Sequence, residues 1–92
     1  MKKSIRLYIT GTFQKMFFNS FIKENAEREN VKGFIRNLDD GRVEIFLEGD
    51  SERVMKLLHL CQKGPKHARI KNIQFKKERY QGLLGHTAGE AL

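Results

Sequence analysis

Residues 4–29, SIRLYITGTFQKMFFNSFIKENAERE, contain a change in the spacing of apolar side chains. Over residues 4–10 apolar and polar residues alternate, which is typical of a strand with one buried face. Over residues 18–29 apolar residues recur every three or four positions, which is typical of an amphipathic helix. The segment therefore predicts a strand, a loop that starts at Gly11, and a helix.

The rest of the chain predicts three more strands and a second helix. Two short β-rich runs, residues 31–36 and 42–48, flank an Asp-Gly pair that suits a hairpin turn. The second helix follows them and ends at Gly64, a residue type that accepts the left-handed cap position. The last strand covers residues 68–77. Its inward positions are Ile70 and then Ile73 and Phe75, and this change in parity predicts a bulge near Lys71 and Asn72.

The element order β-α-β-β-α-β predicts an α+β fold, the ferredoxin-like two-layer sandwich. Right-handed crossovers place both helices on one face of a four-stranded antiparallel sheet. The first two strands then run parallel, so the loop after the first strand and the end of the second lie at the same edge of the sheet. We expect one domain over residues 1–80. Residues 81–92 have three glycines and no period, and we expect a loosely held tail there.

The composition is that of one small domain without a membrane segment. The chain has 92 residues, 39% of them hydrophobic, and its longest apolar run falls far short of the roughly 18 residues that a membrane span needs. A single cysteine, Cys61, forms no internal disulfide and lies on an apolar helix face, where a packed thiol is expected. We expect a cytoplasmic monomer that does not contact a membrane.

The net charge of +7 is concentrated in the second part of the chain. Residues 1–50 carry nine basic and eight acidic side chains, whereas residues 51–92 carry nine and three. Residues 63–79 are therefore expected to attract anions, and one alternative for the protein is a non-catalytic module that binds an anion or a protein there. RNA-recognition domains share the element order, but carboxylates on the third strand would repel phosphate, so we do not expect nucleic acid as a partner.

Four motifs follow one another along the predicted fold. They are GTFQKMFFN at residues 11–19, Ala26, GFIRNLDDGRVE at residues 33–44 and GPKHARI at residues 64–70. In this order and on this fold, the motifs resemble those of the acylphosphatase family. The resemblance extends over about residues 5–77.

The resemblance implies a small hydrolase that cleaves acyl phosphates without a cofactor, a metal ion or a covalent intermediate. In that family, backbone amides of the loop after the first strand hold the phosphate, an arginine at the end of the loop binds its oxygens, and an asparagine at the end of the second strand positions the attacking water. Asn37 matches the asparagine, and Gln14 and Phe18 match their loop positions. The implied ligand is a small acyl phosphate or inorganic phosphate.

Two residues of the loop depart from the family pattern. Asn19 stands where the resemblance requires the arginine, and its neutral amide lacks the charge and the two-pronged contact of a guanidinium. Lys15 replaces a glycine, which removes a residue that tolerates positive φ and adds a positive charge that is a candidate substitute for the guanidinium. Loss of an arginine at a transferring phosphoryl group costs about 10³–10⁵ in rate. We expect weak or absent activity and a phosphate-binding loop formed by Gln14, Lys15, Met16, Phe17, Phe18 and Asn19.

Overall fold

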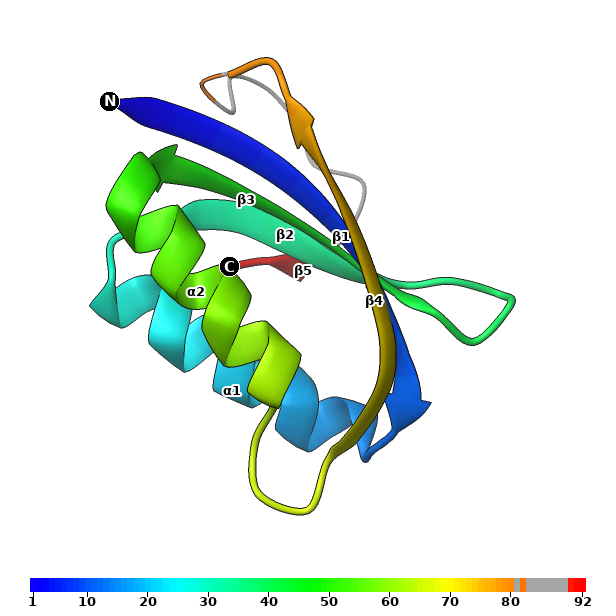
Figure 1. Ribbon diagram of the computed structural model, residues 1–92. Helices are drawn as coiled ribbons and strands as arrows, with labels where there is room; N and C mark the ends of the chain where they lie inside the picture. The colour runs from blue at the N-terminus through cyan, green and yellow to red at the C-terminus, as the bar shows by residue number, and fades with distance from the viewer. Residues whose placement is uncertain (81, 83–89) are drawn as a thin grey trace.

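The fold is a two-layer sandwich in which two helices cover one face of an antiparallel sheet (Figure 1). The computed structural model describes residues 1–80, 82 and 90–92. In chain order the elements are β1 (Lys2–Thr12), α1 (Lys15–Arg28), β2 (Lys32–Asn37), β3 (Val43–Asp50), α2 (Ser51–Lys63), β4 (Arg69–Glu78) and β5 (Glu90–Ala91). The order of the first six elements confirms the ferredoxin-like prediction.

The sheet has the strand order β4-β1-β3-β2-β5. Both β1 and β2 pair antiparallel with β3, so β1 and β2 run parallel to each other, as the crossover rule predicts. The predicted bulge is also present: Thr10 pairs with Asn72 and Gly11 with Ile70, which leaves Lys71 as the extra residue of β4.

A fifth strand extends the predicted four-stranded sheet. Residues 90–91 pair antiparallel with β2, and the N–H of Leu92 donates to the carbonyl of Gly33 at 3.0 Å. These residues belong to the segment expected to be a loose tail, so that expectation does not hold for them. Residues 81 and 83–89, on which the rest of that expectation falls, lie outside the described residues.

The hydrophobic core fills the space between the sheet and the two helices. Its fully buried members are the helix-facing residues of β1 and β3 and the inner faces of α1 and α2: Ile5, Leu7, Ile9, Val43, Ile45, Leu47, Phe18, Ile22, Ala26, Val54, Leu57 and Cys61. Burial raises the pKa of the Cys61 thiol to about 12. The expected packed thiol is therefore confirmed, and its thiolate form is strongly disfavoured.

Local turn chemistry sets the ends of most elements where the sequence predicts them. Gly41 in the β2–β3 hairpin has a φ of 92° and Gly64 after α2 has a φ of 74°. The N–H of Gly64 donates to the carbonyl of Leu60 at 2.8 Å, which closes the last turn of α2. Both glycines thus occupy backbone conformations that other residues adopt only with strain.

A network of charged side chains crosses the face of the sheet opposite the helices. Arg6 on β1 donates to Glu78 on β4 at 2.6 and 3.1 Å and to Glu44 on β3 at 3.1 Å. Tyr8 donates to Glu44 at 3.0 Å, and Arg36 on β2 pairs with the same carboxylate. The network therefore connects all four long strands.

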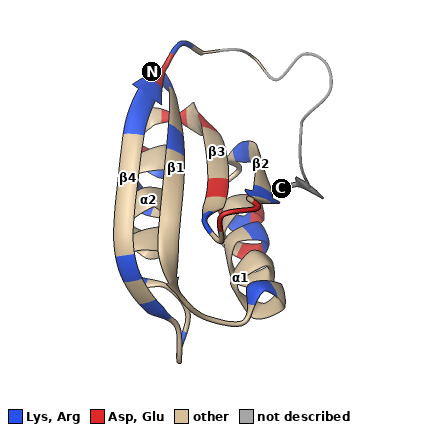
Figure 2. Ribbon diagram, turned by 90° about the vertical axis from the view of Figure 1, so that its right-hand side faces the viewer, with Lys and Arg blue, Asp and Glu red and all other residues tan. Residues whose placement is uncertain are grey.

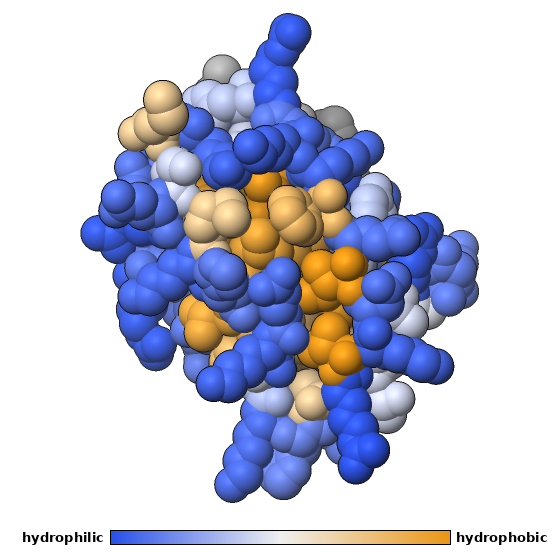
Figure 3. Space-filling model, in the orientation of Figure 1, coloured by the Kyte–Doolittle hydropathy of each residue, from blue (hydrophilic) through white to orange (hydrophobic). Residues whose placement is uncertain are grey.

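Strand β4 is an edge strand with a basic and partly apolar surface. Its cations lie along the edge of the sheet in Figure 2, and Figure 3 shows apolar surface between α2 and β4 among hydrophilic side chains. Of the apolar residues predicted to face inward on this strand, Ile70 and Ile73 pack against the core, whereas Phe75 is 47% exposed. Neither helix is long and apolar enough to cross a membrane among the residues that the structure describes.

Candidate active site

The connection between β1 and α1 is shorter than the sequence predicts. Phe13 and Gln14 alone separate the two elements, and α1 starts at Lys15, so the predicted start at Phe18 is wrong by three residues. The N–H of Phe18 donates to the carbonyl of Gln14 at 3.0 Å, which closes the first helical turn. No residue between 11 and 19 has a left-handed backbone. Because Lys15 favours a helix more than glycine does, the predicted loop winds into α1.

The residues of the predicted phosphate-binding loop therefore form the first turn of a helix. The N–H groups of Lys15, Met16 and Phe17 have no helical carbonyl to bind. Gln14 makes no side-chain capping hydrogen bond, and the first turn contains no acidic residue. These amides and the positive end of the helix dipole favour an anion at this position. The chain thus presents backbone donors for a phosphate on a regular helix.

Aromatic packing holds this turn against the core. Phe18 is fully buried and stacks on Phe13, with 4.4 Å between ring centroids and 24° between ring planes. Met16 and Phe17 are 76% and 63% exposed. Phe18 is therefore a core residue that fixes the turn, whereas the side chains of Met16 and Phe17 lie on the surface, where a ligand can reach them.

Asn19 lies half-buried on α1, at the position where the resemblance requires an arginine. Its Oδ1 is buried and accepts no hydrogen bond from the described part of the chain. A buried acceptor without a donor costs about 1–3 kcal/mol, so the fold gains nothing from this oxygen. The side chain brings no positive charge to the turn.

Asn37 ends β2 at the same edge of the sheet as the first turn of α1. It pairs with Val43 of β3, and Val43 pairs with Ile9 of β1, so the three residues form one row. Asn37 and Ile9 are two strand spacings apart, a backbone separation of about 10 Å. Ile9 and Val43 face the helices, and the exposed Asn37 side chain leaves the sheet on that same side. The predicted common edge is confirmed, although no hydrogen bond joins Asn37 to residues 14–19 among those described.

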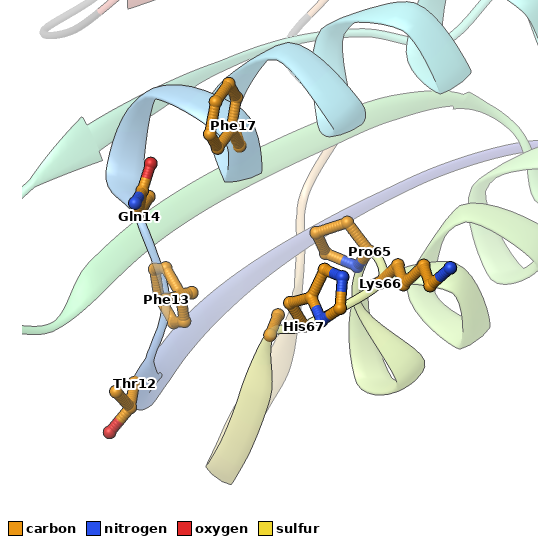
Figure 4. Close-up of a pocket in the computed structure, with 8 residues that line it drawn as sticks. Thr12, Phe13, Gln14, Phe17, Pro65, Lys66 and His67 are labelled. Atoms are coloured by element: carbon orange, nitrogen blue, oxygen red, sulfur yellow. The ribbon is translucent and has the colours of Figure 1, made fainter.

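A cavity of about 500 Å³ opens beside the first turn of α1, on the β4 side (Figure 4). Four of its residues come from the end of β1 and the start of α1 and four from the turn after α2: Thr12, Phe13, Gln14, Phe17, Pro65, Lys66, His67 and Ala68. Of the predicted site residues, Gln14 and Phe17 line it, and Asn19 and Asn37 do not. The turn after α2 belongs to the segment expected to attract anions, but the sequence analysis did not predict that it lies against the start of α1; the GPKHARI motif, in which cations occur without a carboxylate, was the available signal.

Comparison with known proteins agrees with the order of motifs and the fold. A family model described as acylphosphatase matches residues 5–86. An acylphosphatase from Rubrobacter xylanophilus is 41% identical over 80 residues, which cover 87% of this chain and 73% of the relative. One from Pyrobaculum aerophilum is 43% identical over 77 residues, covering 83% of this chain and 81% of the relative.

Solved structures show the same likeness. The crystal structure of acylphosphatase from Bacillus subtilis has a TM-score of 0.79 to this structure at 26% sequence identity, and the match covers 88% of this chain and 89% of that one. The family model spans most of the chain, and the two curated relatives match over nearly the same length. The shared sequence and the shared fold together show that this chain belongs to the acylphosphatase family.

Proposed function

We propose that this protein binds acyl phosphates at the first turn of α1 and hydrolyses them slowly. The observation that carries the proposal is the pair formed by Asn37 and Asn19. Asn37 is exposed at the edge of the sheet where the turn begins, so the water-positioning group is retained. Asn19 places a neutral amide where the family chemistry uses a guanidinium, so the strongest phosphate contact is lost.

The residues present supply part of the chemistry of acyl phosphate hydrolysis. The oxygen of a water molecule attacks phosphorus, the bond from phosphorus to the carboxyl oxygen breaks, and the carboxylate leaves with the electron pair. The protons of the water pass to the phosphate product and to solvent. A carboxylate is a stable anion at neutral pH, so its departure needs no general acid. The backbone N–H groups of residues 15–17 stabilise the negative charge that develops on the phosphoryl oxygens, and the side-chain amide of Asn37 orients the water.

The size of the deficit follows from what Asn19 lacks. Removing one donor to a developing oxyanion costs about 10²–10³ in rate, and removing an arginine at a phosphoryl group about 10³–10⁵. Lys15 begins α1 and adds a positive charge close to the free amides. A lysine ammonium is a flexible point charge without the planar fork of a guanidinium, so it recovers only a part of the loss.

Hydrolysis of benzoyl phosphate by the Asn19→Arg variant tests the proposal. We expect the rate to rise at least about 10²-fold, because the guanidinium returns a fixed, two-pronged contact. Ser20→Arg is the matched control, since it adds the same charge at the next, exposed position of α1 and should leave the rate near that of the wild type. If the hydrolysis rate does not rise in Asn19→Arg, either alone or combined with Lys15→Gly, the proposal that the missing arginine limits the rate is contradicted.

The role of Asn37 needs a separate variant. Asn37→Ala should abolish the residual turnover of the wild-type protein and the gain in Asn19→Arg, whereas Asn72→Ala, which removes an exposed asparagine from β4, should change neither. Unfolding curves of all variants show whether each one is folded. Background rates in every folded variant would favour the alternative, an anion- or protein-binding role of the basic surface formed by residues 63–79.

A further inference from the structure

The cavity beside α1 lies between two sets of mostly apolar side chains (Figure 4). Phe13 and Phe17 lie on one side, and Pro65 and His67 lie on the other. Phe17 is 63% exposed, and the stacking of Phe13 on Phe18 fixes the Phe13 ring. The volume of about 500 Å³ falls within the range of about 300–1,000 Å³ that small-molecule sites occupy. The walls therefore suit a flat apolar group.

The two segments that form the cavity carry positive charge only. Residues 11–19 and 64–70 contain no Asp or Glu, and their basic residues are Lys15, Lys66 and Arg69. Lys66 lines the cavity, and Lys15 starts the adjacent helical turn. A cleft surrounded by charge of one sign concentrates ions of the opposite sign. The cavity is therefore suited to an anion.

The backbone of His67 holds its ring in the wall of the cavity. Its φ is 74°, in the left-handed region that residues other than glycine seldom adopt. The N–H of Ala68 donates to the carbonyl of Pro65 at 3.1 Å and closes the turn around it. Residues in such conformations cluster at ligand-binding sites, where the surrounding structure enforces them. His67 thus belongs to a fixed turn that shapes the cavity.

We propose that this cavity binds the aromatic group of an aromatic acyl phosphate, with the phosphate beside Lys66 and the first turn of α1. The ring would lie between Phe17 and His67 and cover the exposed face of Phe17. The position of the phosphate and the bond that is cleaved rest on the proposed function, whereas the contact with the ring does not involve Asn19 or Asn37, which lie outside the cavity. An alkyl acyl phosphate of the same charge leaves the cavity unfilled and binds more weakly.

Phenylphosphonate is the probe, because it carries a ring and a phosphate-like anion and is not hydrolysed. Added to the isotope-labelled protein, it should shift the amide resonances of Phe13, Phe17 and His67 in a saturable manner. Methylphosphonate has the anion without the ring and should bind about ten-fold more weakly, as expected from the apolar area left unburied. Phe17→Ala should weaken the binding of phenylphosphonate by about the same factor.

Phe75→Ala is the matched control, because it removes a half-exposed phenylalanine from β4, away from the cavity. This variant should retain the affinity of the wild type within about two-fold. Equal affinity for the two phosphonates would overturn the inference. An equal loss of phenylphosphonate affinity in Phe17→Ala and Phe75→Ala would also overturn it. The same holds if the shifts of amide resonances are confined to the β2–β3 hairpin or do not saturate.

Asn37→Ala separates this inference from the proposed function. The variant should lose turnover of benzoyl phosphate and still bind phenylphosphonate with wild-type affinity. Ring-dependent binding without turnover in any variant would contradict the proposed function alone. Turnover that depends on Asn37, together with binding that does not depend on the ring, would contradict this inference alone.

Discussion

His67 occupies a backbone conformation that glycine adopts at lower cost. It is the third residue of the turn from Pro65 to Ala68, and a positive φ at that position is typical of a type II turn, which favours glycine or asparagine there. A residue with a Cβ in the left-handed conformation costs about 1–2 kcal/mol. A glycine removes this strain, but it loses more conformational entropy on folding, which offsets part of the gain. The side chain at this position therefore lowers the stability of the fold.

His67→Gly should raise the free energy of unfolding by up to about 1 kcal/mol. The same variant should bind phenylphosphonate more weakly, because it removes a side chain that lines the cavity. Lys66→Gly is the control: Lys66 itself has no left-handed backbone, so the variant should lower stability by about 0.5–1 kcal/mol. Urea unfolding measures both values, and a His67→Gly variant less stable than the wild type would contradict the assignment of strain.

The sequence indicates which residues are candidates for the site, but it does not indicate their conformations. Asn37 was found from its motif, and the register places it at the predicted edge. The departure at Asn19 was equally visible in the sequence. That the Asn19 oxygen is buried without a donor, and that Phe17 is exposed while Phe18 is buried, depend on where α1 packs. Packing of this kind is decided by tertiary contacts, which residue spacing alone does not specify.

At the scale of elements, the start of α1 differs most from the prediction. The end of β2, the start of β3 and the end of α2 lie within one residue of the prediction, because Gly41 and Gly64 set them through local backbone geometry. The first turn of α1 depends instead on the stacking of Phe13 and Phe18, which are brought together only by the fold. Strand β5 has two residues, too few to show any period, so its pairing with β2 has no sequence signal.

Lys15→Gly should loosen the first turn of α1. Glycine lowers helix stability by up to about 1 kcal/mol relative to other residues, although less at the first helical position than inside a helix. Amide hydrogen exchange should become faster at Phe18, whose N–H closes this turn, and should stay unchanged at the buried Ile22 in the next turn. Lys66→Gly, which lies outside α1, should leave exchange at Phe18 as it is in the wild type. If the Phe18 amide exchanges at the same rate in the wild type and both variants, the helix propensity of Lys15 does not stabilise this turn.

At the scale of the whole molecule, a charge network on the face opposite the helices joins four strands: Glu44 on β3 contacts β1 and β2, and Arg6 on β1 contacts Glu78 on β4. Its side chain is 4% exposed, and that of Arg6 is 19% exposed. Burial alone would raise the pKa of the Glu44 carboxyl, but hydrogen bonds from Tyr8, Arg36 and Arg6 outweigh burial and hold this pKa below 4.5. The ionised form is therefore favoured in the folded state.

The lowered pKa of Glu44 gives a stabilisation that is complete above about pH 4.5 and is lost as the pH falls through the folded-state value. Glu44→Gln should lower the free energy of unfolding at neutral pH by about 1–3 kcal/mol, because Arg36 loses its anion and Arg6 keeps only Glu78. Below pH 4.5 the difference between the variant and the wild type should shrink. Glu24→Gln, at an exposed position of α1, is the control and should follow the wild type at every pH. A constant difference would show that the charge of Glu44 is not what stabilises the sheet.

The position of β1 between β4 and β3, two strands that follow much later in the chain, governs how fast the chain can fold. The hydrogen bond from Ser4 to Glu48 joins residues 44 apart, and that from Arg6 to Glu78 joins residues 72 apart. Sheets that depend on such distant pairings fold in about milliseconds to seconds, because the loops must close before the contacts form. During synthesis, β1 carries a row of apolar side chains and has one unpaired edge until β4 follows. The interval between the synthesis of these two strands is therefore when the chain is most open to aggregation.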